Sequence, residues 1–294
     1  MAAGRESVLG VIGGSGLYDI EGLTETRWEA VASPFGAPSD DFLFGEIAGK
    51  KVVFCPRHGR GHRIPPGEIN YRANVDALKR AGVTEILSIS AVGSLQEDLP
   101  PGTFVIVDQF IDRTVLRERS FFTSGMVAHV SMARPVCGRL GAAIEDQARA
   151  QGIPTVRGGT YLAMEGPQFS SLAESELYRS WGAHVIGMTN MPEAKLAREA
   201  EICYAAVAMV TDYDCWHPGH DDVTVDAIIE TLMANADAAR GLVAGLAPAL
   251  IAAPEPCPLG CHRALDHALI TAPEARDAEV LARLDAVAGR VLGG

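Results

Sequence analysis

The stretch Ile202-Cys-Tyr-Ala-Ala-Val-Ala-Met-Val210-Thr-Asp212-Tyr-Asp214-Cys-Trp216 decides the fold. Its apolar run from 202 to 210 predicts a strand buried on both faces, as in the sheets of α/β proteins. Asp212 and Asp214 follow at the carboxyl end of this strand. Because ligands of open α/β sheets bind beyond the carboxyl ends of strands, the two acids are placed to meet a ligand.

The acid pair limits the chemistry of such a site. Two carboxyl groups held together at the mouth of an apolar sheet do not both ionise easily, because burial and mutual repulsion raise at least one pKa. One of them can then carry a proton at neutral pH and act as a general acid. The alternative is a helix N-cap or a turn, where Asp is equally common.

Length and composition predict one α/β domain. The chain has 294 residues, of which 48% are hydrophobic, and it shows no internal repeat or linker. We therefore expect a single domain over 1–294, with a core at about 8–250 and a helical tail at about 252–294. The net charge of −12 argues against nucleic-acid binding. No apolar run suits a membrane span or a signal peptide, so we expect a cytoplasmic protein.

Six cysteines are mostly scattered singly among apolar residues, which favours small buried side chains in a reducing compartment. Cys257-Pro-Leu-Gly-Cys261 is the one close pair. Since no second pair and no metal-spaced histidine accompanies it, the spacing predicts no metal site. A surface turn or an occasional redox bridge is expected there instead.

Two polar turns follow early predicted strands. After the strand at 8–12, Gly13-Gly-Ser15-Gly can direct backbone N–H groups and the Ser15 hydroxyl at an anion. It matches neither a dinucleotide fingerprint nor a P-loop. After the strand at 51–55, Arg57-His58-Gly-Arg60 offers two guanidinium forks and an imidazole to a phosphate. The alternative is a solvated basic loop.

Three later strand ends carry further polar groups. The strands at 86–89 and 185–188 lead to Ser90-Ala91 and to Thr189, while the strand at 159–164 leads to a helix start. Ser171 and Glu174 have capping-box spacing at that start. The preceding Phe169 could stack on a flat ring or belong to the core. Together the strand ends predict an anion pocket facing a proton donor, which suits cleavage of a glycosidic bond to a nitrogen base.

Five segments carry a family resemblance. They are Gly13-Gly-Ser-Gly-Leu17, Arg57-His-Gly-Arg60, Glu165-Gly-Pro-Gln-Phe-Ser-Ser171, Gly187-Met-Thr189 with Met191-Pro-Glu193, and Thr211-Asp-Tyr-Asp-Cys-Trp216. In this order they resemble the methylthioadenosine phosphorylases of the trimeric purine nucleoside phosphorylase family. The resemblance implies a single-domain, three-layer α/β/α fold around a twisted central mixed sheet. It also implies a homotrimer, or a dimer of trimers, that uses no metal or organic cofactor and takes phosphate as co-substrate.

The resemblance also implies a role for each matching residue. Phosphate would be held by Ser15, Arg57, His58, Ser90, Ala91 and Thr189, with Ser170 nearby. The nucleoside would be met by Met188 at the ribose, Phe169 at the purine, Asp212 and Asp214 at N7 and the N6 amine, and His129, Val225 and Ile229 at the 5' substituent. A neighbouring subunit could supply part of the last group. Ser15 and Ser90 stand where many relatives have Thr, and Gln168 where some have Arg.

The implied reaction is reversible phosphorolysis of S-methyl-5'-thioadenosine to adenine and 5-methylthioribose 1-phosphate. Asp at position 212 can donate to N7 and accept from an N6 amine, which favours adenine over 6-oxopurines. Three alternatives remain at this stage. They are phosphorolysis of another purine nucleoside, hydrolysis by water, and a catalytically silent sensor of adenine nucleosides.

Overall fold

The computed structural model describes residues 7–218, 225–251 and 257–293 of the chain, without the side chains of 15, 225–230, 232 and 251. Its centre is an 11-stranded mixed sheet with the path β2-β3-β4-β1-β5-β10-β9-β7, from which β11, β6 and β8 extend beside β5. The strands are β1 Leu9–Gly13, β2 Leu23–Glu29, β3 Phe42–Ile47, β4 Lys50–Pro56, β5 Glu85–Ser94, β6 Phe104–Val107, β7 Gln109–Asp112, β8 Thr155–Arg157, β9 Thr160–Ala163, β10 Val185–Gly187 and β11 Cys203–Asp212.

Strand β11 lies at the centre of the core, as its apolar run predicts. It pairs in parallel with β5 from Cys203 opposite Glu85 to Asp212 opposite Gly93. Its other edge pairs antiparallel with β6. Alternate residues of β11 belong to different hydrophobic clusters, with Val207 on one face of the sheet and Ala208 on the other. The absence of a polar face on this strand follows from helices covering both sides.

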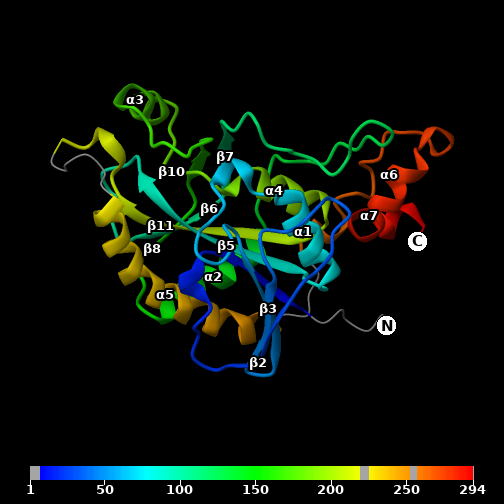
Figure 1. Ribbon diagram of the computed structural model, residues 1–294. Helices are drawn as coiled ribbons and strands as arrows, with labels where there is room; N and C mark the ends of the chain where they lie inside the picture. The colour runs from blue at the N-terminus through cyan, green and yellow to red at the C-terminus, as the bar shows by residue number, and fades with distance from the viewer. Residues whose placement is uncertain (1–6, 219–224, 252–256, 294) are drawn as a thin grey trace.

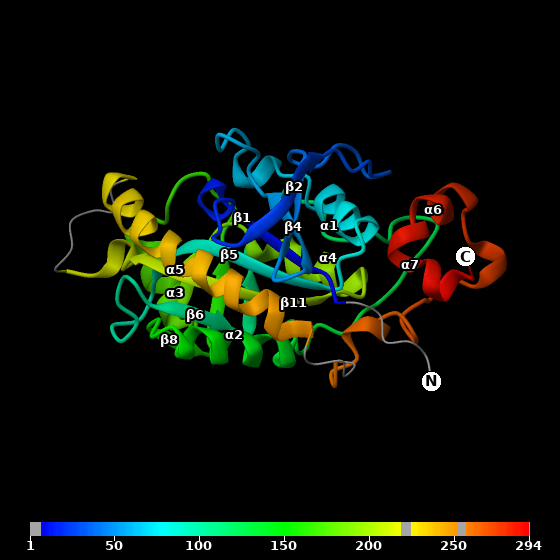
Figure 2. The same ribbon diagram turned by 90° about the horizontal axis from the view of Figure 1, so that it is seen from below.

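The seven described helices form the outer layers. They are α1 Tyr71–Arg80, α2 Gly138–Ala150, α3 Leu172–Ser180, α4 Asn190–Glu199, α5 Val225–Ile251, α6 Ala278–Arg283 and α7 Asp285–Leu292. Leu140 of α2 and Leu246 of α5 belong to the cluster on one face of the sheet, while Leu78 of α1 and Leu196 of α4 belong to the cluster on the other. Figures 1 and 2 show this layering, with α6 and α7 at one end of the molecule and α3 at the other. The three-layer α/β/α prediction is confirmed.

Several local predictions need correction. The apolar segment that begins at Phe104 forms two short strands, β6 and β7, and α1 begins at Tyr71 after a short 3-10 turn at Pro66–Glu68. Strands β2 and β8 were not predicted, because both are mostly polar and lie at the sheet margin. Strand β10 runs antiparallel to β5 rather than parallel to it. The residues after β10 therefore meet β5 partway along its length.

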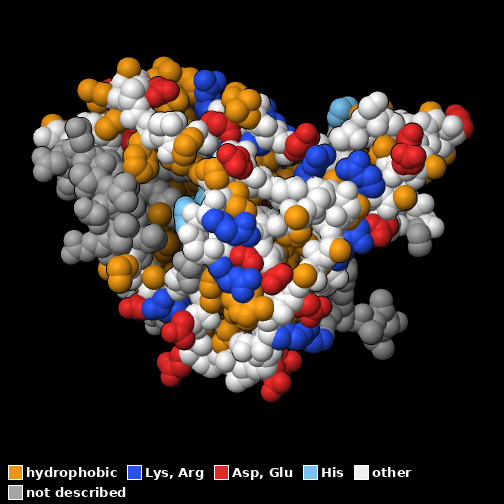
Figure 3. All heavy atoms as spheres, viewed as in Figure 1, with side chains coloured by type: hydrophobic (Ala, Val, Ile, Leu, Met, Phe, Trp, Pro, Cys, Tyr) orange, Lys and Arg blue, Asp and Glu red, His pale blue; other side chains and the backbone are white. Residues whose placement is uncertain are grey.

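Charged side chains of both signs are mixed on the surface of the molecule. On the face seen in Figure 3, Lys and Arg side chains lie intermingled with Asp and Glu side chains. Among the described helices, none is both long and apolar enough to span a bilayer.

Candidate active site

Asp212 and Asp214 lie at the carboxyl end of β11 and contact each other. The Thr211 hydroxyl donates to Asp212 Oδ2 at 2.8 Å, and the Asp214 backbone N–H donates to Asp212 Oδ1 at 2.8 Å. Burial raises the pKa of Asp212 against these two hydrogen bonds. Burial also raises the pKa of Asp214, with a further rise from the charge of Asp212 and an opposing effect of Ser175. The structure thus places the two carboxyl groups together with raised pKa values.

Because Gly93 of β5 has no side chain, Asp212 and Asp214 can pack directly against the strand. A Cβ atom at Gly93 would come within 3.0 Å of Asp212 Oδ1 and 3.3 Å of the Asp214 Cβ. Asp214 itself adopts a left-handed conformation with φ of +53°, which is uncommon for a residue other than Gly. Its carboxyl group is therefore held by tertiary structure and not by the preference of a regular turn.

Ser90 and Thr189 meet farther back along β5. Both hydroxyl groups donate to Asn190 Oδ1, from Ser90 at 3.1 Å and from Thr189 at 3.4 Å. The antiparallel course of β10 delivers Thr189 to this point. Ser90 and Gly93 are three positions apart on β5, so the hydroxyl pair and the acid pair are about 10 Å apart along this strand. That separation matches a ribose with a phosphate on one side and a base on the other.

The Arg57 side chain is turned into the protein. It is only 2% exposed and pairs with Glu193, whose Oε2 accepts from Arg57 Nε at 3.0 Å. Its Nη1 donates to the Ile89 carbonyl at 2.9 Å, and its Nη2 donates to the Ser88 hydroxyl at 2.6 Å. The guanidinium fork predicted to hold phosphate is engaged with Glu193 in this structure. Arg57 can therefore attract an anion through its buried positive charge, which Glu193 partly neutralises.

His58 and Arg60 complete the basic loop. The His58 Nδ1 lies 2.8 Å from the Ile64 carbonyl oxygen, which can only accept a hydrogen bond. Burial first, and then the charge of Arg57, lower the pKa of His58 to about 4. The ring is therefore neutral with its proton on Nδ1, and Nε2 is the nitrogen that remains for a ligand. Arg60 pairs with Asp40 and lies over the ring of Trp28, so its predicted fork is engaged on the surface.

The segment before α3 lies beside the acid pair. Ser171 caps α3 and forms the predicted capping box with Glu174. The Cys215 thiol donates to the Ser170 carbonyl at 3.4 Å, which joins this segment to the turn that holds Asp214. Phe169 is 51% exposed, so the alternative that it belongs to the core is wrong.

The three residues predicted for the 5' substituent are not assembled within one chain. The exposed His129 donates its backbone N–H to the Ala268 carbonyl at 2.8 Å, in the C-terminal tail. The Leu265 N–H in turn donates to Glu201, just before β11 begins. His129 therefore lies near the opposite end of β11 from Asp212 within one chain, and the alternative that a neighbouring subunit supplies it stays a prediction. The side chains of Val225, Ile229 and the phosphate candidate Ser15 lie outside the described residues.

Sequence reasoning missed the side chains that hold these segments together. Arg117 is 7% exposed and donates to the carbonyls of Met188 at 2.5 Å and Met191 at 2.7 Å. It also pairs with Glu165 at 2.8 Å. Arg117 thus holds the Met188 backbone in place through its carbonyl oxygen. Neither Arg117 nor the Glu193 partner of Arg57 has a local signal, because each pairs with residues distant in sequence.

Comparison with known proteins identifies the family. The profile described as "Phosphorylase superfamily" matches residues 8–251. The chain belongs to the phosphorylase superfamily. Within this superfamily it is 64% identical to the S-methyl-5'-thioadenosine phosphorylase of Rhodospirillum rubrum, over 98% of both chains. It is also 64% identical to the S-methyl-5'-thioadenosine phosphorylase of Cereibacter sphaeroides, over 98% of this chain and 100% of that protein.

Solved structures of superfamily members show the same fold. A methylthioadenosine phosphorylase from an antarctic soil metagenomic library superposes with a TM-score of 0.91 at 47% identity, covering 96% of this chain and 99% of that one. A variant adenosine/methylthioadenosine phosphorylase of Schistosoma mansoni, solved with methylthioadenosine, superposes with a TM-score of 0.80 at 38% identity. That comparison covers 84% of this chain and 92% of the other.

Proposed function

We propose that the protein is a pentosyltransferase that catalyses the reversible phosphorolysis of S-methyl-5'-thioadenosine to adenine and 5-methylthioribose 1-phosphate. The observation that carries this proposal is the position of the acid pair over Gly93, about 10 Å along β5 from the hydroxyl groups of Ser90 and Thr189. The names of the relatives at 64% identity support the same reaction.

The reaction separates charge across this distance. As the C1'–N9 bond stretches, positive charge grows on the ribosyl ring and negative charge on the purine. A phosphate oxygen near Ser90 and Thr189 forms the new bond to C1', while the purine keeps the electron pair of the broken bond. Burial raises the pKa of Asp212, which favours the protonated form, and this carboxyl group would donate a proton toward N7.

The state of His58 fits hydrogen phosphate. Because Nδ1–H donates to the Ile64 carbonyl, the neutral ring can accept a hydrogen bond from a P–OH group at Nε2. This arrangement adds no second cation to the pocket. The fixed positive charge would come instead from Arg57, which is buried and paired with Glu193.

We also propose that the protein works as a homotrimer in the cytoplasm, without a cofactor in the reaction. The exposure of large apolar side chains supports a subunit contact, because Leu116 is 82% exposed and Leu172 is 57% exposed. A neighbouring subunit could then bring its own His129 to the 5' substituent. Light scattering at working concentration gives the oligomer mass, and a monomer would contradict this part.

The reaction itself is tested by adenine release. Methylthioadenosine should yield adenine only when phosphate is added, with slower release from adenosine and little hypoxanthine from inosine. Adenine formed equally without phosphate would indicate a hydrolase. No product from any nucleoside, despite tight adenine binding, would indicate a sensor.

A further inference from the structure

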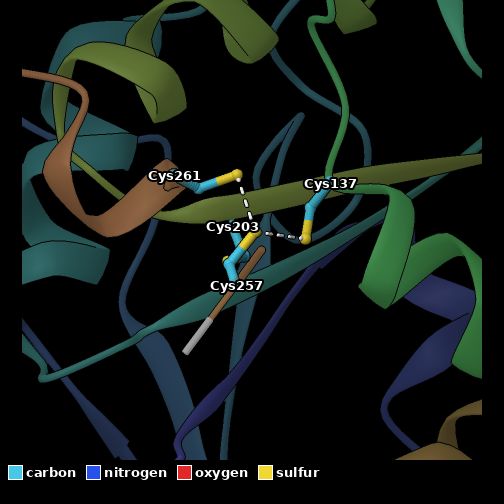
Figure 4. A group of neighbouring side chains, drawn as sticks. All are labelled: Cys137, Cys203, Cys257 and Cys261. Atoms are coloured by element: carbon cyan, nitrogen blue, oxygen red, sulfur yellow. Dashed lines mark hydrogen bonds between the residues drawn. The ribbon is translucent and has the colours of Figure 1, made fainter. Parts of the chain in front are cut away.

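Four cysteines form a buried cluster that the proposed reaction does not use. The Sγ atoms of Cys137, Cys203, Cys257 and Cys261 all lie within 4.8 Å of one another. Cys257 Sγ lies 3.4 Å from that of Cys137 and 3.3 Å from that of Cys261. Figure 4 shows the four side chains converging from separate segments on one point. All four are buried free thiols.

The fold brings together cysteines that are far apart in sequence. Cys137 precedes helix α2 and donates its backbone N–H to the Tyr204 carbonyl at 2.7 Å, next to Cys203 at the start of β11. Cys257 and Cys261 come from one tight turn. In that turn the Gly260 N–H donates to the Cys257 carbonyl at 2.8 Å, and Gly260 has a left-handed φ of +65°. The turn therefore directs both thiols to the same side.

This arrangement matches the ligand set of a tetrahedral metal ion. Four thiolates bind structural Zn²⁺ at about 2.3 Å, which places tetrahedral sulfur atoms about 3.8 Å apart. The sulfur separations here lie on both sides of that value, between 3.3 Å and 4.8 Å. Closing on an ion needs shifts of roughly 1 Å or less. The spacing of Cys257 and Cys261 also falls in the range of zinc turns.

Two guanidinium groups flank the cluster with the charge that a metal–thiolate centre needs. Four thiolates around Zn²⁺ carry a net charge of −2, which is costly to bury without nearby cations. Arg198, 8% exposed, has Nη1 at 3.5 Å from Cys261 Sγ. Arg139 also pairs with Glu85, interacts with Cys203 and has a buried Nε without a hydrogen-bond partner, so it offsets only part of the thiolate charge. Such outer partners orient and stabilise metal ligands.

A cleft gives access to the cluster. It has a volume of about 430 Å³, and its lining includes Cys137, Arg139, Pro258 and Leu259. The cleft lies at the start of β11, away from the acid pair at the other end of this strand. The cleft therefore approaches the cluster at Cys137, on a side of the molecule away from the proposed active site.

We propose that Cys137, Cys203, Cys257 and Cys261 bind one structural Zn²⁺ ion. The ion joins the C-terminal tail to helix α2 and to the first residue of β11. Binding releases the thiol protons to solvent and involves no electron transfer. This site overturns the sequence expectation of no metal, because the second pair of ligands is assembled by the fold. It is independent of the proposed reaction.

The direct test is the metal content of the intact, reduced wild-type protein. Protein purified without chelators should contain one zinc per chain by plasma mass spectrometry, and chelator-treated protein should regain one zinc on titration with ZnCl₂. The regained ion should raise the temperature of unfolding. Because this measurement uses the native chain, it does not depend on whether a variant folds.

Variants then assign the ligands. Cys257→Ser should lose the zinc, whereas Cys55→Ser should keep one zinc per chain, because Cys55 is equally buried but outside the cluster. Arg198→Met keeps all four thiols and should weaken zinc binding by about 10- to 100-fold.

Three outcomes would overturn the proposal. The first is reduced wild-type protein that neither contains nor takes up zinc. The second is a Cys257–Cys261 disulfide in the purified protein whose reduction does not restore zinc binding. The third is stoichiometric iron in place of zinc, since thiolate sites also accept iron.

Discussion

The two ends of strand β11 differ in what their polar side chains do. At the carboxyl end, Asp212 and Asp214 are held together over a glycine with raised pKa values, and Asp214 has a left-handed backbone conformation. At the amino end, Cys203 joins three other thiols, and Glu201 pairs with Arg290 of the tail. The carboxyl end holds two carboxyl groups close together, while the amino end joins the tail to the core. The difference separates a site built for reaction from one built for stability.

The largest expected effect tests the reactive end. Asp212→Asn removes the proton that is given toward N7, and should lower the kcat for methylthioadenosine by about 10²- to 10⁴-fold. The temperature of unfolding should change little, because Asn keeps the shape, its oxygen can accept from the Asp214 N–H, and its NH₂ group can donate to the Thr211 hydroxyl oxygen. Adenine release measured by absorbance gives the rate.

Asp146→Asn is the matched control, because this carboxyl group is exposed on α2. It should leave kcat unchanged. Near-full activity of Asp212→Asn would remove the general-acid role from this end of the strand.

Metal removal tests the other end. If zinc is present at about 1,000 times its dissociation constant, it stabilises the fold by about 4 kcal/mol. Chelation of the reduced protein should lower its stability toward urea by that amount, while kcat at low temperature stays the same. Loss of activity in parallel with zinc, without unfolding, would show that the two ends are coupled.

The pH dependence of the free energy of unfolding should also reveal a buried acid near the amino end of β11. Burial raises the pKa of Glu199, just before β11, to about 7, although the Phe121 N–H and the Ser120 hydroxyl bind it. The folded state then holds more protons than the unfolded state between about pH 4.5 and 7, so this group stabilises at low pH and loses that contribution as the pH rises through 7. The contribution of Glu199 to the free energy of unfolding falls by about 3 kcal/mol over this pH range.

The His58 contribution has the opposite sign. Its lowered pKa of about 4 means that the unfolded state takes up the proton first, so stability falls as the pH drops below about 6.5. Glu199→Gln should therefore leave a protein that loses stability between pH 7 and pH 5 more steeply than the wild type. Equal urea midpoints for both proteins across this range would contradict the assignment to Glu199.

The smallest effect is expected at the surface of the tail. Asp285 of α7 pairs with Arg80 of α1, but its side chain is 56% exposed and Arg80 also pairs with Asp76. Asp285→Ala should cost less than about 1 kcal/mol in urea unfolding. A cost as large as that of zinc removal would mean that ion pairs, and not thiols, hold the tail.

Local patterns predicted the parts of the site that depend on one strand and its turn. The apolar run ending in Asp212 and Asp214 specified a buried strand with acids at its mouth, and the Ser171 capping box specified the start of α3. Periodicity could not show that β10 runs antiparallel to β5, because direction depends on partners distant in sequence. It also could not show that Arg57 turns inward to Glu193.

The sequence by itself determined the alternation of buried strands and helices, and the position of a carboxyl pair at the end of the central strand. Hydrophobic periodicity is a local property, because it depends only on residues that are close together in the sequence. Only the tertiary structure decided that His129 lies far from Asp212 within one chain, and that Cys137 and Cys203 meet Cys257 and Cys261. Those contacts join segments more than fifty residues apart, and only the packing of the whole core fixes their distances.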